Sequence, residues 1–190
     1  MRIRMHHILV LVLLVVPAAA AFAATDAETV KVFREAGESG KFFDKCYGYA
    51  IFPNIGKGGL VVGGAHGTGR VYVGGKVVGD TEMSQLSFGL QAGGESYSEI
   101  IFFEDKRAFD EFSSGSFEFG AGTSAVVITS GASAKTGSGG SSAGASGGKH
   151  DATTAGAYHK GYAVFTVIKG GAMFDASVTG QKFKYTPKKK

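Results

Sequence analysis

The side chains that could perform catalysis begin with two pairs of neighbouring carboxylates. Glu104 stands next to Asp105, and Asp110 stands next to Glu111. Two carboxyl groups can act as general acid and general base when their environments push their pKa values apart. Both pairs fall on a predicted surface helix over 104–112, where adjacent carboxylates are typical of a solvated face. The carboxylates therefore do not predict an acid–base site.

Histidines and glycine-rich loops carry no stronger signal for chemistry. Beyond residue 23 the histidines are His66, His150 and His159, and their spacing matches neither a helical metal-binding pair nor a nucleophile motif. The run Gly56-Lys57-Gly58-Gly59 lacks the spacing of a phosphate-binding loop, and no helical pattern follows it. We predict no enzyme, no metal and no cofactor. An enzyme whose site is assembled from residues far apart in the sequence is the remaining alternative of this kind.

The net charge argues against one class of partner once it is divided along the chain. The 190 residues carry 20 Lys and Arg against 16 Asp and Glu, a formal charge of +4. Arg2 and Arg4 lie near the N-terminus, and Lys188, Lys189 and Lys190 end the chain; without these five, 15 basic residues face 16 acidic ones. The body of the chain is close to neutral, so we predict no nucleic-acid partner.

Residues 1–23 are predicted to be a cleavable signal peptide. The two arginines form a positive n-region, Ile8 to Val16 form an apolar h-region, and Ala21-Phe22-Ala23 matches a small-x-small cleavage pattern. We expect residues 24–190 to be exported, to be periplasmic or associated with the envelope, or to be secreted. Cys46 is the single cysteine, so no internal disulfide can form, and a small core residue is expected there.

Helical chemistry is concentrated in residues 26–47. Asp26 can cap the first turn, and Phe33 falls on an apolar face. Gly37 and Gly40 are predicted to divide the segment into two short helices, the second of which carries the apolar side chains that precede residue 47.

Short apolar runs after Pro53 predict strands. Leu86, Phe88 and Leu90 alternate with Ser87 and Gln91, as in a strand with two different faces. The chain contains 31 glycines, many of them in pairs that are typical of tight turns and bulges. With the glycines as breaks, the predicted strands are 47–52, 59–65, 69–74, 76–79, 84–92, 97–103, 116–128, 157–168 and 171–185.

The predicted fold class is mainly β within α+β. We expect an antiparallel sheet, a sandwich or a barrel-like core, with short N-terminal helices and one short helix near 104–112. Residues 130–149 contain 7 Gly and 6 Ser and are predicted to be a flexible loop. The strands after this loop are too few to form a stable domain alone, so they must rejoin the first sheet. One domain is therefore expected over 24–190, with a short basic tail.

Four motifs in order give the chain a family resemblance. They are YGYAIFPNIGKGGLVVGGAHGTGRVYVGG at 47–75, FGLQAGGESYSEIIFF at 88–103, FGAGTSA at 119–125 and YHKGYAVFTVIKGGAMFDASVTGQKFKY at 158–185. The first combines an aromatic-Ala-Ile-Phe-Pro segment with a glycine-rich pair of strands. In these motifs the sequence resembles the SYLF-domain family, and with the signal peptide it is similar to that family's stand-alone bacterial branch.

The resemblance implies a lipid-binding protein without enzymatic activity. Some eukaryotic relatives bind phosphoinositides and actin filaments. This chain differs from them in its predicted export signal and in having no second adaptor domain, so actin binding is not carried over. The expected partner is a membrane surface, an anionic lipid or another amphiphile.

The candidate lipid-binding residues lie in the N-terminal helical segment. Basic and aromatic side chains alternate there, which suits an interfacial helix whose cations meet head groups while its rings enter the acyl boundary. Packing of the same rings on the sheet is the alternative. The candidates are Lys31, Phe33, Arg34, Lys41, Phe42, Phe43 and Lys45.

Two further functions remain open at this stage. Export, glycine, aromatic residues and period-two strands also fit a small outer-membrane β-barrel, although the C-terminal lysines are atypical of one. A structural protein of the envelope is the second alternative.

Overall fold

The structure is a computed structural model that describes residues 25–115, 117–119, 126–128 and 157–189. The predicted signal peptide at 1–23 and the predicted loop at 130–149 lie outside the described residues. In chain order the elements are α1 (Asp26–Glu35), α2 (Gly37–Gly40), β1 (Gly48–Val73), β2 (Lys76–Phe103), α3 (Lys106–Phe112), β3 (Phe117–Phe119), β4 (Val126–Ile128) and β5 (Tyr162–Pro187).

Three very long strands form the body of the protein. They pair in the order β1-β2-β5, antiparallel throughout, and the short strand β3 continues the sheet beyond β5. The strand β4 pairs with β5 in parallel. The predicted class, a mainly antiparallel β protein with short helices, is confirmed; in the described part of the chain the sheet is open, with β1 at one edge.

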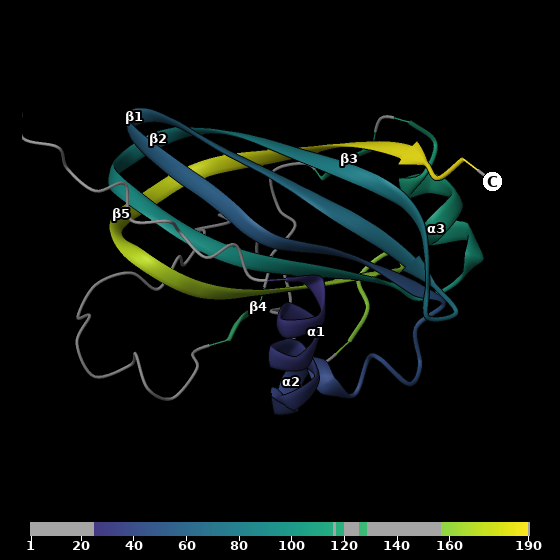
Figure 1. The fold of residues 1–190 in the computed structure, drawn as a ribbon. Coiled ribbons are helices and arrows are strands. Elements are labelled where there is room, and N and C mark those ends of the chain that lie inside the picture. Colours follow the sequence, from purple (N-terminus) through teal and green to yellow (C-terminus); the bar gives the residue numbers. More distant parts are fainter. Residues whose placement is uncertain (1–24, 116, 120–125, 129–156, 190) are drawn as a thin grey trace, which may run out of the picture.

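The three long strands turn back on themselves together, so that the sheet folds into two layers (Figure 1). Residues 48–58 of β1 lie in one layer, which we call the first layer, and residues 63–73 lie in the other. A Cβ atom at Gly67 would stand 2.6 Å from Cγ1 of Ile55, although both residues belong to β1. This close approach of two backbones is possible only because Gly67 has no side chain.

The predicted division into many short strands was wrong, because it treated glycine pairs as breaks between strands. Most of the paired glycines lie inside continuous strands, at bends and at close approaches of two backbones. Gly74 and Gly75 are different: both have positive φ, 56° and 77°, and they form the two-residue turn between β1 and β2.

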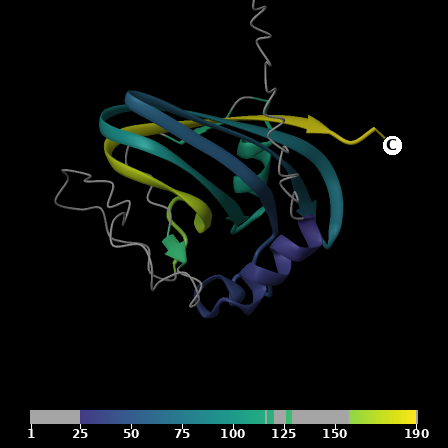
Figure 2. The same ribbon diagram turned by 60° about the vertical axis from the view of Figure 1, so that its left-hand side comes forward.

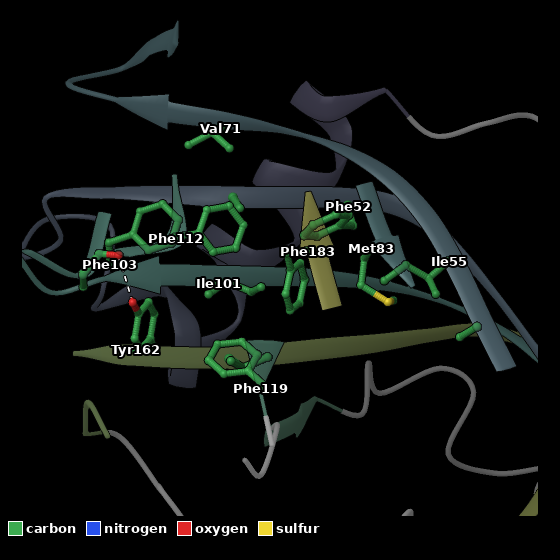
Figure 3. Packing of buried hydrophobic residues seen from close by; sticks show 14 of the residues in the cluster. Phe52, Ile55, Val71, Met83, Ile101, Phe103, Phe112, Phe119, Tyr162 and Phe183 are labelled. Atoms are coloured by element: carbon green, nitrogen blue, oxygen red, sulfur yellow. Dashed lines mark hydrogen bonds between the residues drawn. The ribbon is translucent and has the colours of Figure 1, made fainter. Parts of the chain in front are cut away.

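Buried side chains form two clusters, one on each side of the first layer. The inner cluster lies between the two layers and is covered at one end by α3; it includes Phe52, Met83, Phe112 and Phe183 (Figure 3). The outer cluster lies between the first layer and the N-terminal helices, which Figure 2 shows on the outside of the sheet. Burial on both faces explains why every residue from 97 to 103 is buried.

The residue that caps α1 differs from the predicted one. Thr25, not Asp26, caps α1: its side chain accepts a hydrogen bond from Glu28 N, and the Glu28 carboxylate accepts one from Thr25 N. The Asp26 carboxylate instead accepts from Tyr72 and Arg70 of β1, at 2.8 and 3.0 Å. It therefore anchors α1 to the sheet.

The second helix is shorter than predicted. It spans only Gly37–Gly40, and the segment after it is a turn that carries Phe42 and Phe43. Cys46 follows this turn, is half-buried beside the outer cluster, and has a pKa raised by burial.

Phe102 holds the N-terminal segment on the sheet, and its removal should be costly. Its ring is fully buried and lies 4.9 to 6.0 Å, centroid to centroid, from Phe43, Phe42 and Phe165. We expect Phe102→Ala to lower the free energy of unfolding by about 3–5 kcal/mol, because a large cavity remains. Urea denaturation checks this, with Val32→Ala as an exposed control. A loss below about 1 kcal/mol would contradict the packing described here.

Candidate functional site

The aromatic residues predicted to face lipid lie against the sheet. Phe33 and Phe42 are buried in the outer cluster, and Phe43 is half-buried at its edge. Phe42 stacks on Phe102, and Phe43 meets the same ring edge-on. The rings thus take the core-packing alternative in this structure, and only a displacement of the N-terminal segment would expose them.

The basic residues of the same segment remain on the surface. All four are exposed: Lys31, Arg34, Lys41 and Lys45. The Arg34 guanidinium lies 4.3 Å from the centroid of the Phe43 ring, and Lys31 Nζ lies 3.8 Å from a Glu35 carboxylate oxygen. The structure therefore leaves these cations accessible to solvent, whereas the rings of Phe33 and Phe42 are buried.

A different surface gathers the exposed apolar side chains. Six of them follow the bend of β1 and β2, each between 54% and 75% exposed; we call this surface the crest. Its members are Leu60, Val61, Val62, Leu86, Phe88 and Leu90. Val62 pairs directly with Phe88 across the two strands. The other large hydrophobic side chains exposed in the described residues, Val32 and Tyr47, are less exposed than any in the crest.

The interior of the bend is polar where the crest is apolar. The side chains of Ser87 and Gln91 alternate with those of the crest and point between the layers, where both are buried. Gln91 Nε2 donates to the carbonyl oxygens of Val61 and Ser87, both at 3.1 Å, and Ser87 Oγ donates to Gln91 Oε1 at 2.8 Å. This network satisfies the carbonyl of Val61, whose φ of 67° is unusual for a β-branched residue.

At the bend, the outward side of β2 is therefore apolar and the inward side is polar. Elsewhere in β2, the side chains pointing between the layers include Met83 and Ile101, and the outward ones near the start of the strand are polar or charged, as at Glu82 and Ser84. A contiguous apolar patch of this kind marks a surface that contacts another protein or a membrane. A backbone carbonyl already bonded inside the bend can enter hydrocarbon without losing a partner.

A second polar group lies deeper between the layers. The Glu99 carboxyl is fully buried; one oxygen accepts a hydrogen bond from Gln181 Nε2 at 3.2 Å, and the other, Oε1, has no hydrogen-bond partner. Burial raises the pKa of this carboxyl to about 7, and the Gln181 bond opposes that rise. The sequence carried no signal for Glu99, because its hydrogen-bond partner Gln181 is 82 residues away along the chain.

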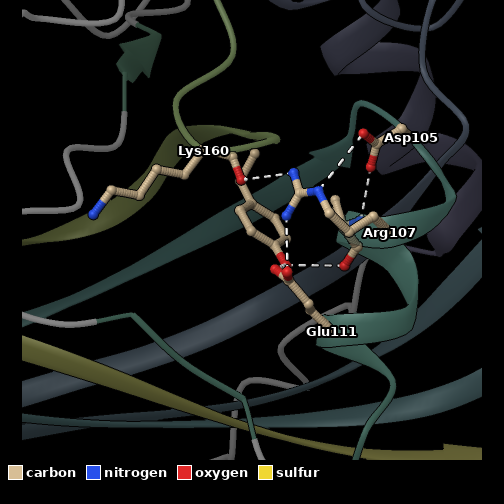
Figure 4. A network of polar contacts seen from close by, with 6 residues as sticks. Asp105, Arg107, Glu111 and Lys160 are labelled. Atoms are coloured by element: carbon tan, nitrogen blue, oxygen red, sulfur yellow. Dashed lines mark hydrogen bonds and ion pairs between the residues drawn. The ribbon is translucent and has the colours of Figure 1, made fainter.

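The carboxylates around α3 form hydrogen bonds and ion pairs with neighbouring groups (Figure 4). Asp105 caps the helix by accepting from Ala108 N at 2.8 Å. Arg107 donates to Glu111 at 2.8 Å and to the carbonyl of Lys160 at 3.4 Å. Tyr162 also donates to Glu111, and burial together with this contact raises the pKa of the Tyr162 hydroxyl. These groups bond to one another and join α3 to the start of β5.

The histidines considered in the sequence form no metal centre among the residues that the structure describes. His66 is exposed on β1, and His159 lies in a backbone bridge with Tyr162. His150 lies outside the described residues. Over the same residues, no group of three or more His, Cys, Asp and Glu side chains is arranged to hold an ion.

None of the helices described here has the length and apolar character needed to cross a bilayer.

Comparison with known proteins gives two matches. The family model Ysc84, described as Las17-binding protein actin regulator, matches residues 84–188. The beta cell expansion factor A of Aeromonas veronii is 36% identical over 108 residues, which are 56% of this chain and 40% of that protein. The match thus spans less than half the length of this relative. No solved structure matches the chain significantly.

Proposed function

The chain belongs to the Ysc84 family, the family of SYLF domains. From this membership and from the exposed apolar crest we propose that it is a lipid-binding protein that docks on membranes through the crest, and from its N-terminal sequence that it is exported. The predicted resemblance to SYLF-domain proteins is thereby confirmed. The family consists of binding domains without enzymatic activity, and the roles associated with it are lipid binding and the regulation of actin.

The crest is the observation that carries the proposal. Burying a Leu, Val or Phe side chain contributes about 1.5–3 kcal/mol relative to full exposure. Six such side chains on one surface can therefore offset the cost of holding the protein at a bilayer. No member of the crest is charged. The proposed contact is consequently with the acyl region, and the four exposed cations of the N-terminal segment add a weaker attraction to anionic head groups.

Co-flotation with vesicles tests this function. Residues 24–190 would be mixed with phosphatidylcholine vesicles and with vesicles that also contain phosphatidylglycerol, each at 50 mM and 500 mM NaCl. We expect association with both vesicle types and little loss at high salt, because apolar burial is not screened. Failure to associate with either vesicle at either salt concentration would contradict lipid binding. Association limited to anionic vesicles at low salt would assign binding to the cations and not to the crest.

Export is proposed on the N-terminal sequence pattern alone. Expression of the full chain in a bacterial host with a secretory pathway, followed by intact-mass measurement, tests it. We expect a product that begins at Ala24. A cytoplasmic product that retains residues 1–23 would contradict this part of the proposal.

A further inference from the structure

The single hydrogen bond of Glu99 connects the two layers of the folded sheet. Within its own layer Glu99 pairs in register with Phe52 of β1 and Thr166 of β5. Its hydrogen-bond partner Gln181 pairs instead with Gln85, in the other layer. Gln181 Nε2 donates two hydrogen bonds, one to the carboxyl oxygen Oε2 of Glu99 and one to the amide oxygen Oε1 of Gln85, each at 3.2 Å. The three side chains thus form one polar link across the interior.

The link has no positive charge to support an ionised carboxylate. None of the ion pairs in the described residues includes Glu99. The titratable neighbour from β2 is Tyr97, whose own pKa is raised by burial and by Glu99. Farther along β2, Glu95 pairs with Lys57 of β1 at 3.5 Å.

Among the described side chains of the remaining elements, none acts on the Glu99 carboxyl as a charge. From α3 the inner cluster receives Ala108 and Phe112. The one acidic residue of β3, Glu118, is exposed and pairs with Lys182 of β5 at 2.8 Å. An ionised Glu99 would therefore be buried with one neutral donor and an unpartnered oxygen, which is costly.

We propose that Glu99, Gln181 and Gln85 act as a proton-controlled clasp, closed when the Glu99 carboxyl is neutral and opened at the bend when the carboxyl ionises and takes up water. Opening separates the layers beside the crest and presents inner apolar side chains such as Ile55 and Met83 together with it. The clasp is thus a regulator of the crest, and its effect on membranes rests on the proposed function. Burial raises the carboxyl pKa from 4.5 to about 7 in the closed form, so opening becomes easier as pH rises between these two values.

Hydrogen exchange without lipid tests the clasp itself. Amide protection in residues 94–99 and 166–171 would be followed from pH 5.5 to 8.5 and corrected for the intrinsic exchange rate. In the wild type we expect protection to fall as pH rises from 5.5 to 7, by up to tenfold for each pH unit, and to level off above 7, because the closed form alone loses its proton near pH 7 while the open form is already ionised. In Glu99→Gln we expect protection that does not vary with pH. The matched control, Glu82→Gln, changes an exposed carboxyl of the same strand and should behave as the wild type.

Two further measurements keep the outcome decisive. If Glu99→Gln does not fold, the carboxyl carbon shift of Glu99 in the wild type should titrate in the same pH range as the change in protection. A carboxyl that titrates near 4.5, or protection that is flat with pH in the wild type, would overturn the clasp. Flotation with phosphatidylcholine vesicles should increase from pH 6 to pH 8.5 in the wild type only. If protection changes as expected while no vesicle binds, the clasp stands and the lipid-binding function fails.

Discussion

The double substitution Phe88→Lys and Leu90→Lys is expected to abolish association with neutral vesicles while the fold is retained. The two side chains are 60% and 71% exposed, so their loss removes little native packing, and the free energy of unfolding should change by less than about 1 kcal/mol. At the membrane the same change removes two apolar side chains worth about 1.5 kcal/mol or more each. Because 1.4 kcal/mol is a tenfold change in affinity, partitioning should fall about a hundredfold.

Neutral phosphatidylcholine vesicles are essential to this experiment, because two added lysines would by themselves favour anionic membranes. The matched control is Ser84→Lys with Thr68→Lys, which adds the same charge at exposed positions of β2 and β1 outside the crest. The control should bind as the wild type does. Equal loss in both variants would assign the effect to charge. A variant that changes the oligomeric state without changing flotation would make the crest a protein interface.

Glu99→Gln is expected to stabilise the protein at alkaline pH and to remove one component of its pH dependence. Because burial raises the carboxyl pKa from 4.5 to about 7 in the folded state, folding takes up a proton between these values. The stability due to the neutral carboxyl is fully present below pH 4.5 and is lost as pH rises through 7. At 1.36 kcal/mol per pKa unit, the loss is about 3 kcal/mol.

The measurement is urea denaturation of both proteins at pH 4.5 and pH 8.5. The difference between them isolates Glu99, since every other titrating group is shared. We expect similar stability at the lower pH and a variant that is more stable by about 3 kcal/mol at the higher one. Glu82→Gln should show no such crossover. A variant equally stable to the wild type at pH 8.5 would mean that the carboxyl gains a counter-charge or water in the folded protein.

Local sequence signals predicted the regular elements well where neighbours along the chain determine them. The helix near 104–112 is present as α3, since Asp105 provides its own cap and Phe112 its apolar face. The first helix ends where Gly37 was expected to interrupt it. Alternation of Leu86, Phe88 and Leu90 with Ser87 and Gln91 correctly separated the two faces of β2.

The sequence left the outcome open, or predicted it wrongly, where that outcome depends on contacts between distant residues. Paired glycines are equally compatible with a turn and with a close approach of two backbones, and Gly67 takes the second role only because Ile55 folds back onto it. The rings of Phe33 and Phe42 could have faced lipid or the sheet. Their burial was decided by an apolar surface on the first layer that includes Phe102 and Phe165.

The sequence by itself determined a mainly β protein of the SYLF family, with two different faces on its strands and little positive charge in its body. Only the tertiary structure decided which face is inside. Period-two alternation is symmetric between the two sides of a strand, and burial is a property of what packs on it. At the bend the polar side chains Ser87 and Gln91 turn inward to bond the backbone, and Glu99 meets Gln181, which is 82 residues away along the chain. The crest and the clasp arise from that folding of the sheet upon itself.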